Sequence, residues 1–282
     1  MSTKRQNPET IAIHGGDYRN DPTTKAVAVP IYRTTSYQFD STEHAANLFS
    51  LKEFGNIYSR IMNPTADILE KRITAIEGGA AALSVASGQA ASAYSVQNLA
   101  VSGDNIICST DIYGGTWNLF NNTLKQQGIE VRFVDPVDPE NFLKATDSRT
   151  RAYYAETLPN PKLRVFPIAE VAAIGRKIGI PLIVDNTLAT PYLLQPIKWG
   201  ADLVVNSTTK FLSGHGTSMG GVLTESGTFD WAVDDKFPSM TQPEPAYHGL
   251  TFYETFGDFG FTMKARAVGL RDFGPSMAPA NA

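Results

Sequence analysis

The hydrophobic and polar positions of this chain follow one pattern between residues 80 and 225 and another outside these limits. Inside them, short apolar runs alternate with segments of helical periodicity. The predicted strands are 80–86, 105–109, 130–135, 151–156, 180–185, 201–206 and 221–224. The predicted helices between them are 90–101, 116–127, 141–146 and 167–178. Strands that alternate with helices indicate βαβ units, so we predict an α/β fold with a mostly parallel sheet flanked by helices.

The two ends of the chain lack this alternation. Residues 1–60 are irregular, and we expect an extended arm that packs on a neighbouring subunit, since a long structureless segment is unusual within a compact domain. A helix follows, with Thr65 as its expected N-cap and Gly78-Gly79 as its stop. After residue 225 the chain is rich in Pro, Gly and aromatic residues until a helix is predicted to begin over 261–270.

These patterns divide the chain into an arm (1–60), an α/β domain (61–260) and the start of a further, C-terminal domain (261–282). The chain has 282 residues, of which 24 are basic and 28 acidic, giving a net charge of −4. Because no basic stripe accompanies this balance, a nucleic-acid partner is not expected. Cys108 is the single cysteine, which excludes an intrachain disulfide and a cysteine-based zinc site. With no secretory signal and no long apolar run visible, we expect a cytoplasmic protein without a membrane partner.

Polar side chains gather where predicted strands end. Lys210 follows the strand 201–206, Asp185 ends the strand 180–185, and Tyr113 follows the strand 105–109. In α/β proteins, ligands bind at the carboxyl ends of the strands. A lysine there can form a Schiff base, a carboxylate can hold a protonated ring nitrogen, and an aromatic ring can stack on a flat ligand. Each residue also has an ordinary interpretation, as a surface lysine, a turn cap and a core tyrosine.

Two further turns complete the pattern. Ser87-Gly88-Gln89 lies between a strand and a helix, where backbone N–H groups can bind phosphate, although an ordinary turn would look the same. Hydroxyl groups near Lys210 could receive an anion as well. A lysine, a carboxylate, an aromatic ring and a phosphate site are together what pyridoxal phosphate requires.

The chain resembles the Cys/Met-metabolism family of pyridoxal-phosphate enzymes, which have fold type I. The resemblance covers almost the whole chain in the family's order. Its motifs are Tyr58-Ser59-Arg60, Asn63-Pro64-Thr65, Ser87-Gly88, Asp111-Ile112-Tyr113-Gly114-Gly115, Glu156-Thr157-Leu158-Pro159-Asn160-Pro161, Asp185-Asn186-Thr187 and Ser207-Thr208-Thr209-Lys210. Within the family, Pro245-Ala246-Tyr247-His248-Gly249 and Arg271-Asp272-Phe273-Gly274-Pro275 are similar to O-acetylhomoserine sulfhydrylases.

The resemblance implies a role for each matching residue. Lys210 would carry the cofactor and move protons, and Tyr113 would stack on the ring and assist the leaving group. Asp185 would pair with the ring nitrogen, and Asn160 would hydrogen-bond the phenolic oxygen. The residues implied for the phosphate are Gly88, Gln89, Ser207 and Thr209, joined by Tyr58 and Arg60 of a neighbouring subunit.

The implied reaction is γ-replacement in methionine biosynthesis and trans-sulfuration. O-acetylhomoserine would react with sulfide or a methylthiol to give homocysteine or methionine plus acetate. The implied assembly is at least a dimer, and a homotetramer by analogy. The family's C-terminal domain is expected to be largely absent from this sequence, and with it the arginine that binds the substrate carboxylate.

Several alternative functions compete with this interpretation. A methionine γ-lyase or a cystathionine γ-synthase or lyase would share the motifs, and a non-catalytic cofactor-binding or assembly remnant would lack the C-terminal domain. Gly216-Thr217-Ser218-Met219-Gly220 fits the G-x-S-x-G pattern of serine hydrolases, but no strand directly precedes it. The glycines follow Lys210, unlike those of a P-loop, and the four histidines lack metal-ligand spacing.

Overall fold

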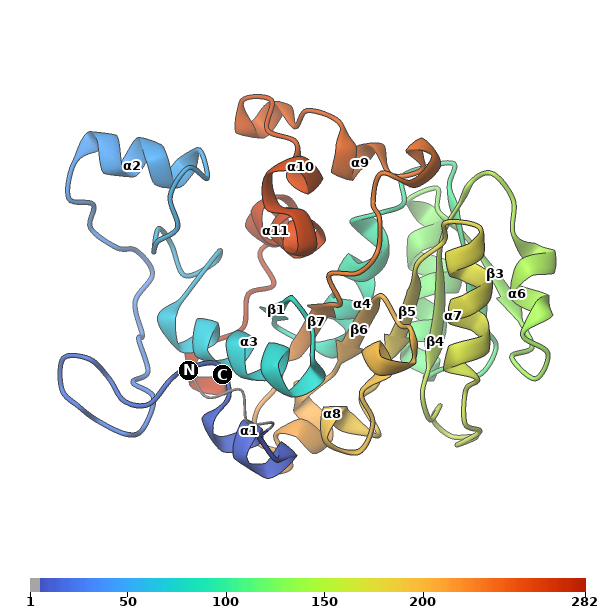
Figure 1. The fold of residues 1–282 in the computed structure, drawn as a ribbon, viewed down its shortest axis with the longest axis horizontal. Helices are drawn as coiled ribbons and strands as arrows, with labels where there is room; N and C mark the ends of the chain where they lie inside the picture. The colour runs from blue at the N-terminus through green and yellow to red at the C-terminus, as the bar shows by residue number, and fades with distance from the viewer. Residues whose placement is uncertain (1–5) are drawn as a thin grey trace.

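A seven-stranded sheet forms the centre of the protein in the computed structural model, which describes residues 6–282 (Figure 1). Its strands are β1 (Ala81–Val85), β2 (Asn105–Ser109), β3 (Glu130–Val134), β4 (Thr150–Glu156), β5 (Leu182–Asp185), β6 (Leu203–Asn206) and β7 (Gly221–Glu225). They lie in the order β1-β7-β6-β5-β4-β2-β3. The pairs from β6 to β3 are parallel, whereas β7 runs antiparallel between β1 and β6. The predicted α/β fold with a mostly parallel sheet is confirmed.

Helices cover both faces of the sheet. They are α1 (Pro8–His14), α2 (Thr42–Phe49), α3 (Pro64–Glu77), α4 (Gly88–Gln97), α5 (Gly114–Asn118), α6 (Glu140–Ala145), α7 (Ile168–Lys177), α8 (Thr190–Leu193), α9 (Pro238–Thr241), α10 (Phe252–Phe256), α11 (Gly260–Lys264) and α12 (Arg271–Phe273). The predicted helix 116–127 is α5 with a π-helical continuation, Leu119–Leu124. The predicted helix 261–270 is α11 with the π-helical segment Ala265–Leu270.

Successive side chains along each strand point to opposite faces of the sheet, and one large hydrophobic core lies on each face. On β4, Tyr154 faces a core that includes α4 and α11, whereas Tyr153 faces a core that includes α6 and α7. A smaller core joins α3 to β1 and β7 through Ile73, Ile76 and Val222. Because parallel strands are buried on both faces, each is nearly continuous in apolar residues, which is why the runs were recognisable in the sequence.

The start of α3 differs from the prediction. Asn63, not Thr65, is the N-cap, because its side-chain oxygen accepts a hydrogen bond from the Thr65 backbone N–H at 3.0 Å. The Thr65 hydroxyl instead donates to the Pro30 carbonyl oxygen at 2.9 Å. The predicted stop is confirmed, since Gly78 ends the helix in the left-handed conformation with φ of 77°.

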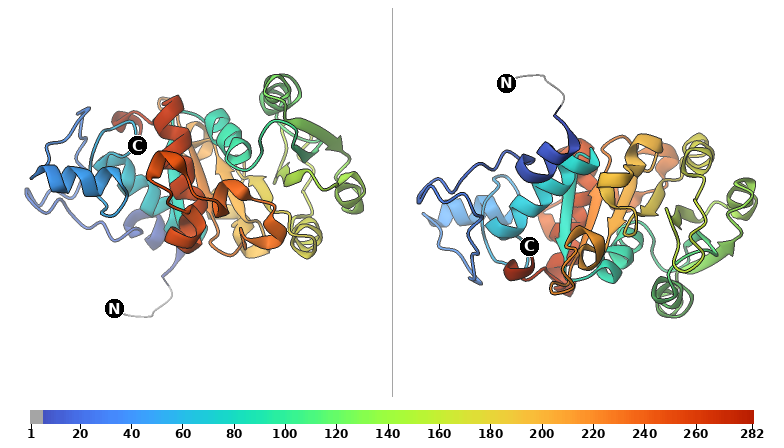
Figure 2. Two further views of the ribbon diagram at one scale, coloured as in Figure 1. Left: turned by 90° about the horizontal axis from the view of Figure 1, so that it is seen from above. Right: turned by 90° about the horizontal axis from the view of Figure 1, so that it is seen from below.

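Residues before α3 hold two helices that the sequence pattern did not reveal. Helix α1 packs on α3, while the rest of the segment, with α2, projects from the β1 end of the sheet (Figures 1 and 2). Val27 and Phe54 on this segment are exposed. Its packing on a neighbouring subunit stays a prediction, as do the domain boundaries. Among residues 6–282, no helix combines the length and apolar character needed to cross a membrane.

Candidate active site

Asp185 and Ser207 are joined through one threonine at the carboxyl ends of β5 and β6. The Thr187 backbone N–H and hydroxyl donate to Asp185 Oδ1 at 2.9 and 2.6 Å. The same hydroxyl oxygen accepts a hydrogen bond from the Ser207 backbone N–H at 2.8 Å. The carboxyl group and the turn that leads to Lys210 are therefore held at a fixed separation.

The amino end of α4 lies directly against this turn. A Cβ atom added to Gly88 would lie 2.6 Å from Ser207 Cβ, so only glycine permits this approach. Ser87 caps the helix, since its hydroxyl accepts from the Ala90 N–H at 3.1 Å. The Gln89 side chain donates to the Thr116 hydroxyl at 3.1 Å, which links α4 to α5. The first N–H groups of α4 are thus presented beside Ser207.

Glu156 brings the remaining two turns to the same place. Its Oε1 accepts from the Tyr113 backbone N–H at 2.6 Å, and its Oε2 accepts from the Asn160 backbone N–H at 3.4 Å. Glu156 also stands beside Asp185 in the parallel pairing of β4 with β5. Tyr113 itself is 48% exposed, so its ring can meet a ligand. Tyr113, Asn160 and Asp185 therefore share one edge of the sheet.

Two carboxyl groups thus lie side by side, with Glu156 buried and Asp185 half-buried. Burial raises the pKa of Glu156 to about 8, and the charge of Asp185 adds to the rise. Burial also raises the pKa of Asp185, but hydrogen bonds from Thr187 and Tyr154 oppose this effect. Because Glu156 and Asp185 are neighbours on adjacent strands, repulsion between two negative charges disfavours ionising both carboxyl groups. Asp185 is therefore the member that carries the negative charge, while Glu156 holds a proton.

Lys210 lies beyond Ser207 in a turn, Thr208–Leu212, and is exposed. Its φ of −93° and ψ of −122° interrupt the helical geometry of that turn. Within the described residues, its Nζ has no hydrogen-bond or ion-pair partner, so the amine is free to react. The Thr209 hydroxyl is engaged, since it donates to the Gly220 carbonyl oxygen at 3.2 Å and accepts from the Gly220 N–H at 3.1 Å.

Arg60, with Tyr58 beside it, contacts the C-terminal segment around Arg271 and Gly274. The Arg60 guanidinium stands 5.4 Å from the centre of the Tyr58 ring and donates to the Arg271 carbonyl oxygen at 2.5 Å. Neither residue forms a hydrogen bond to the strand-end residues within the part of the chain that the structure describes. Their predicted contact with a neighbouring subunit's phosphate stays a prediction.

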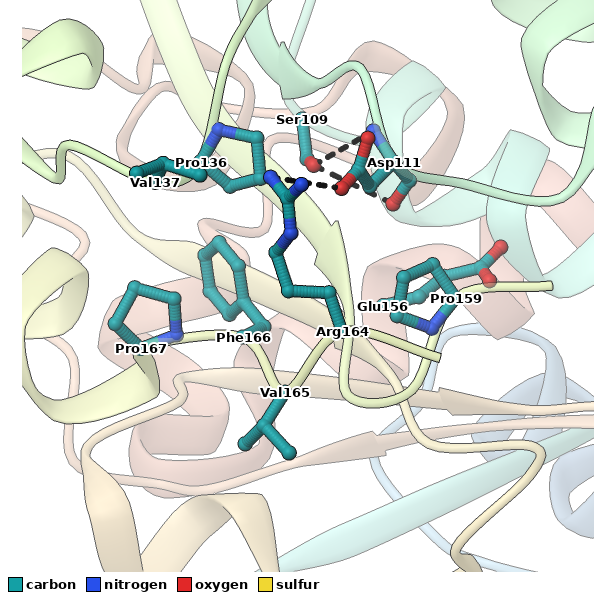
Figure 3. A pocket seen from close by; sticks show the side chains of 10 residues that line it. All are labelled: Ser109, Asp111, Pro136, Val137, Glu156, Pro159, Arg164, Val165, Phe166 and Pro167. Carbon is teal, nitrogen blue, oxygen red and sulfur yellow. Dashed lines mark hydrogen bonds and ion pairs between the residues drawn. The ribbon is translucent and has the colours of Figure 1, made fainter. Parts of the chain in front are cut away.

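A cavity of about 270 Å³ opens next to Glu156 (Figure 3). The buried Asp111 carboxylate lies on its wall and pairs with Lys162 Nζ at 2.5 Å and Arg164 Nη1 at 3.5 Å. These ion pairs join the segment before Tyr113 to the segment after Asn160. The two turns are consequently connected twice, once by Glu156 and once by Asp111.

Residues 9–282 match the profile of a family described as Cys/Met metabolism PLP-dependent enzyme. The chain belongs to this family. The family depends on pyridoxal phosphate, the cofactor that the resemblance implied.

Curated relatives of this chain share about half of its residues. The chain is 54% identical to O-acetyl-L-homoserine sulfhydrylase of Leptospira meyeri, over 98% of this chain and 64% of the relative. It is 51% identical to O-acetyl-L-homoserine sulfhydrylase 1 of Thermus thermophilus, over 96% of this chain and 64% of the relative. The chain thus spans about 64% of the length of these curated relatives.

Solved structures of family members superpose on this fold. A putative O-acetylhomoserine (thiol)-lyase from Campylobacter jejuni, containing N'-pyridoxyl-lysine-5'-monophosphate, has a TM-score of 0.94 and 43% identity, and the match covers 98% of this chain and 68% of that chain. A cystathionine γ-lyase from Lactobacillus plantarum, complexed with L-serine, has a TM-score of 0.76 and 30% identity, and the match covers 98% of this chain and 61% of that chain.

The strand-end residues fit the family's cofactor chemically. An exposed primary amine, a half-buried carboxyl group and an exposed aromatic ring, those of Lys210, Asp185 and Tyr113, follow the carboxyl ends of strands in one sheet. Beside them, Gly88 leaves the space that lets α4 direct its first N–H groups toward Ser207. An anion is stabilised at such a position by the helix dipole and by unpaired backbone donors.

Glu156, Thr187 and Asp111 were not among the predicted site residues, although they organise the site. A signal for Glu156 was present in the sequence, because it ends a predicted strand as Asp185 does. Thr187 and Asp111 lie in motifs of the family resemblance, but their partners Ser207 and Lys162 are distant in sequence, so the motifs alone do not show these contacts.

Proposed function

We propose that the protein catalyses γ-replacement on O-acetylhomoserine, with sulfide or a methylthiol, to give homocysteine or methionine plus acetate. The observation that carries this proposal is the high identity to O-acetyl-L-homoserine sulfhydrylases over nearly the whole chain. The motifs Pro245-Ala246-Tyr247-His248-Gly249 and Arg271-Asp272-Phe273-Gly274-Pro275 point to the same group of enzymes.

Bound pyridoxal phosphate would supply an electron sink for negative charge that develops on the substrate. Asp185, kept ionised beside Thr187, would hold a proton at the ring nitrogen. The Lys210 amine would hold the cofactor and move protons at the substrate's Cα and Cβ. Tyr113 would stack on the ring and assist departure of acetate, and the Asn160 amide would bind the phenolic oxygen.

The phosphate would lie at the amino end of α4. The Gly88 and Gln89 N–H groups and the Ser207 hydroxyl would donate to it. Thr209 would join them by exchanging one of its hydrogen bonds to Gly220 for one to the phosphate. Arg60 suits a phosphate because a guanidinium forms paired hydrogen bonds, and with Tyr58 it would come from the neighbouring subunit.

This arrangement requires at least a dimer, and we propose a homotetramer in the cytoplasm. The exposed apolar side chains of the projecting segment, among them Val27 and Phe54, support the association. Sedimentation at several protein concentrations tests the assembly, and a monomer at micromolar concentration would contradict it.

An assay with two substrate sets tests the reaction. O-acetylhomoserine with sulfide should yield homocysteine and acetate in equal amounts, and Lys210→Ala should lower the rate by roughly 10³-fold or more. Release of ammonia and a methylthiol from methionine alone would favour a γ-lyase instead. Bound cofactor without turnover of either substrate set would favour a non-catalytic cofactor-binding protein.

A further inference from the structure

We propose that Glu156 is a positioning residue of the cofactor site, whose carboxyl group holds the Tyr113 turn and the Asn160 turn beside Asp185. This inference rests on the proposed binding of pyridoxal phosphate. It concerns a residue that would touch neither the cofactor nor the substrate, and that acts through two residues that would.

The contacts of Glu156 divide between two segments that are 47 residues apart, since Tyr113 and Asn160 precede and follow it in different loops. One carboxyl oxygen accepts the Tyr113 N–H at 2.6 Å, and the other faces the Asn160 N–H at 3.4 Å. Both are backbone contacts, so they fix the path of each turn and leave the Tyr113 ring and the Asn160 amide free. A single side chain thereby sets the spacing of a stacking group and a hydrogen-bonding group.

The strand pairing places this carboxyl group where both turns begin. Glu156 ends β4 opposite Asp185 at the end of β5, so the predicted partner of the ring nitrogen is its direct neighbour. The cavity in Figure 3 lies on its other side, bounded by Pro159 and Phe166. Besides Glu156, the ion pairs of Asp111 with Lys162 and Arg164 and the hydrogen bond from the Phe166 N–H to the Thr157 carbonyl oxygen restrain these segments. Of these contacts, only those of Glu156 reach the backbone N–H groups of both Tyr113 and Asn160.

The surroundings of Glu156 favour its neutral form. The ionisable groups that face it are Asp185 on β5 and Cys108 on β2, and Tyr154 lies beside them on β4. None of these three is a cation. Asp111 and Arg164 line the cavity beside Glu156, but Arg164 pairs with Asp111 and Asp135, and no lysine or arginine pairs with Glu156 within residues 6–282. A second negative charge beside Asp185 would be uncompensated and costly. A neutral carboxyl group still accepts the Tyr113 N–H through its carbonyl oxygen.

Three variants test the proposal by cofactor affinity and by the absorption maximum of bound pyridoxal phosphate. Glu156→Ala removes both contacts and should weaken binding by about tenfold or more and shift the absorption maximum. Glu156→Gln keeps a carbonyl oxygen for the shorter contact with the Tyr113 N–H, although its amide nitrogen cannot accept from the Asn160 N–H. Because the retained contact is the stronger one, this variant should stay within about threefold of the unmodified protein, with an unshifted maximum. Glu156→Asp withdraws the carboxyl group by one methylene and should resemble Glu156→Ala, which keeps the test available if the alanine variant does not fold.

Glu225→Ala is the matched control. Glu225 is a buried carboxyl group that accepts the Thr262 N–H at 2.8 Å, but it lies at the opposite end of the sheet, beside the first residue of β6. Its loss should lower stability without changing cofactor affinity or absorption. Unfolding of the cofactor-free proteins in urea measures that stability separately.

The outcomes separate this inference from the proposed function. An unmodified protein that does not bind pyridoxal phosphate would contradict the proposed function itself. An unmodified protein that binds it while Glu156→Ala and Glu156→Asp bind equally well would overturn the positioning role alone. If Glu156→Gln binds pyridoxal phosphate as weakly as Glu156→Ala does, the assignment of a neutral Glu156 carboxyl group is overturned. If Glu225→Ala changes the absorption maximum and the cofactor affinity as much as Glu156→Ala does, the effect comes from general destabilisation, and the proposal is overturned.

Discussion

The Thr187 hydroxyl donates to Asp185 Oδ1 at 2.6 Å and at the same time accepts the Ser207 N–H, so one atom connects two strand ends. Thr187→Val keeps the shape of the side chain but leaves the Ser207 N–H without its acceptor and Asp185 without one donor. We expect a loss of about 1–3 kcal/mol in the free energy of unfolding, together with weaker cofactor binding. Urea unfolding and a pyridoxal phosphate titration measure the two effects. Thr187→Ser, which retains the hydroxyl, should behave nearly as the unmodified protein. A serine variant that loses as much stability and cofactor affinity as the valine variant would refute this explanation.

The close approach of Gly88 to Ser207 makes a second prediction. Gly88→Ala would place a methyl group 2.6 Å from Ser207 Cβ, so the start of α4 must move away from the β6 end. We expect a cost of about 1–3 kcal/mol in stability and a loss of phosphate-dependent affinity. The measurement is cofactor affinity compared with that for pyridoxal, which lacks the phosphate. Gly269→Ala is the control, because an added Cβ there would meet the Tyr94 ring at an ordinary 3.9 Å. Equal effects of the two substitutions would show that the contact with Ser207 is unimportant.

The sequence predicted the strands and the strand-end residues well, for a physical reason. Parallel strands buried on both faces are continuous apolar runs, and the polar residue that ends each one, such as Asp185, stands out. The direction of β7 could not be predicted in this way, because an apolar run such as Gly221–Glu225 has the same pattern in either orientation. The N-cap of α3 was misassigned because both Asn63 and Thr65 are good capping residues. Pro64 favours Asn63, since proline suits the first helical position, and the Thr65 hydroxyl is engaged by the Pro30 carbonyl oxygen, which is distant in sequence.

Glu156 shows where prediction of the site from sequence stops. Its position at a strand end was visible, but its function depends on the adjacency of β4 to β5 and on two loops that meet only in the folded chain. Arg60 shows the complementary case. Its predicted partner is a phosphate in another subunit, and within the single chain it contacts the Arg271 carbonyl instead.

Buried carboxyl groups make the stability of the protein dependent on pH. Burial raises the pKa of Glu77 to about 8, opposed only by the nearby Asn206 amide, whereas its ordinary value is 4.5. The folded state therefore binds a proton that the unfolded state has lost between these values. The stabilisation is fully present below pH 4.5 and decreases as pH rises to about 8. The total change is on the order of a few kcal/mol, since each pKa unit corresponds to about 1.4 kcal/mol.

Glu77→Gln should remove much of this dependence, because the amide does not titrate. Urea unfolding at intervals from pH 5 to pH 8 measures the slope, and the variant should become the more stable protein at the alkaline end. Part of the slope should persist, because burial also raises the pKa of Glu156 to about 8 and that of Glu225 to about 7. The exposed Glu254→Gln substitution should leave the slope unchanged. A slope of opposite sign, with stability rising over this range, would contradict the assignment of Glu77 as a buried neutral group.

The predicted sharing of the phosphate between subunits can be tested by complementation. If Arg60 serves the neighbour's site, Arg60→Ala and Lys210→Ala damage opposite halves of the same composite site. Each variant alone should be nearly inactive, but co-expression should produce mixed dimers in which one site combines an intact Lys210 with an intact Arg60. Random pairing puts half of the dimers in this form with one of two sites restored, so activity should return to about one quarter of the unmodified level. Activity no greater than the sum of the separate variants would show that both residues serve the site of their own chain, and the projecting segment would then lose its predicted role in the cofactor site.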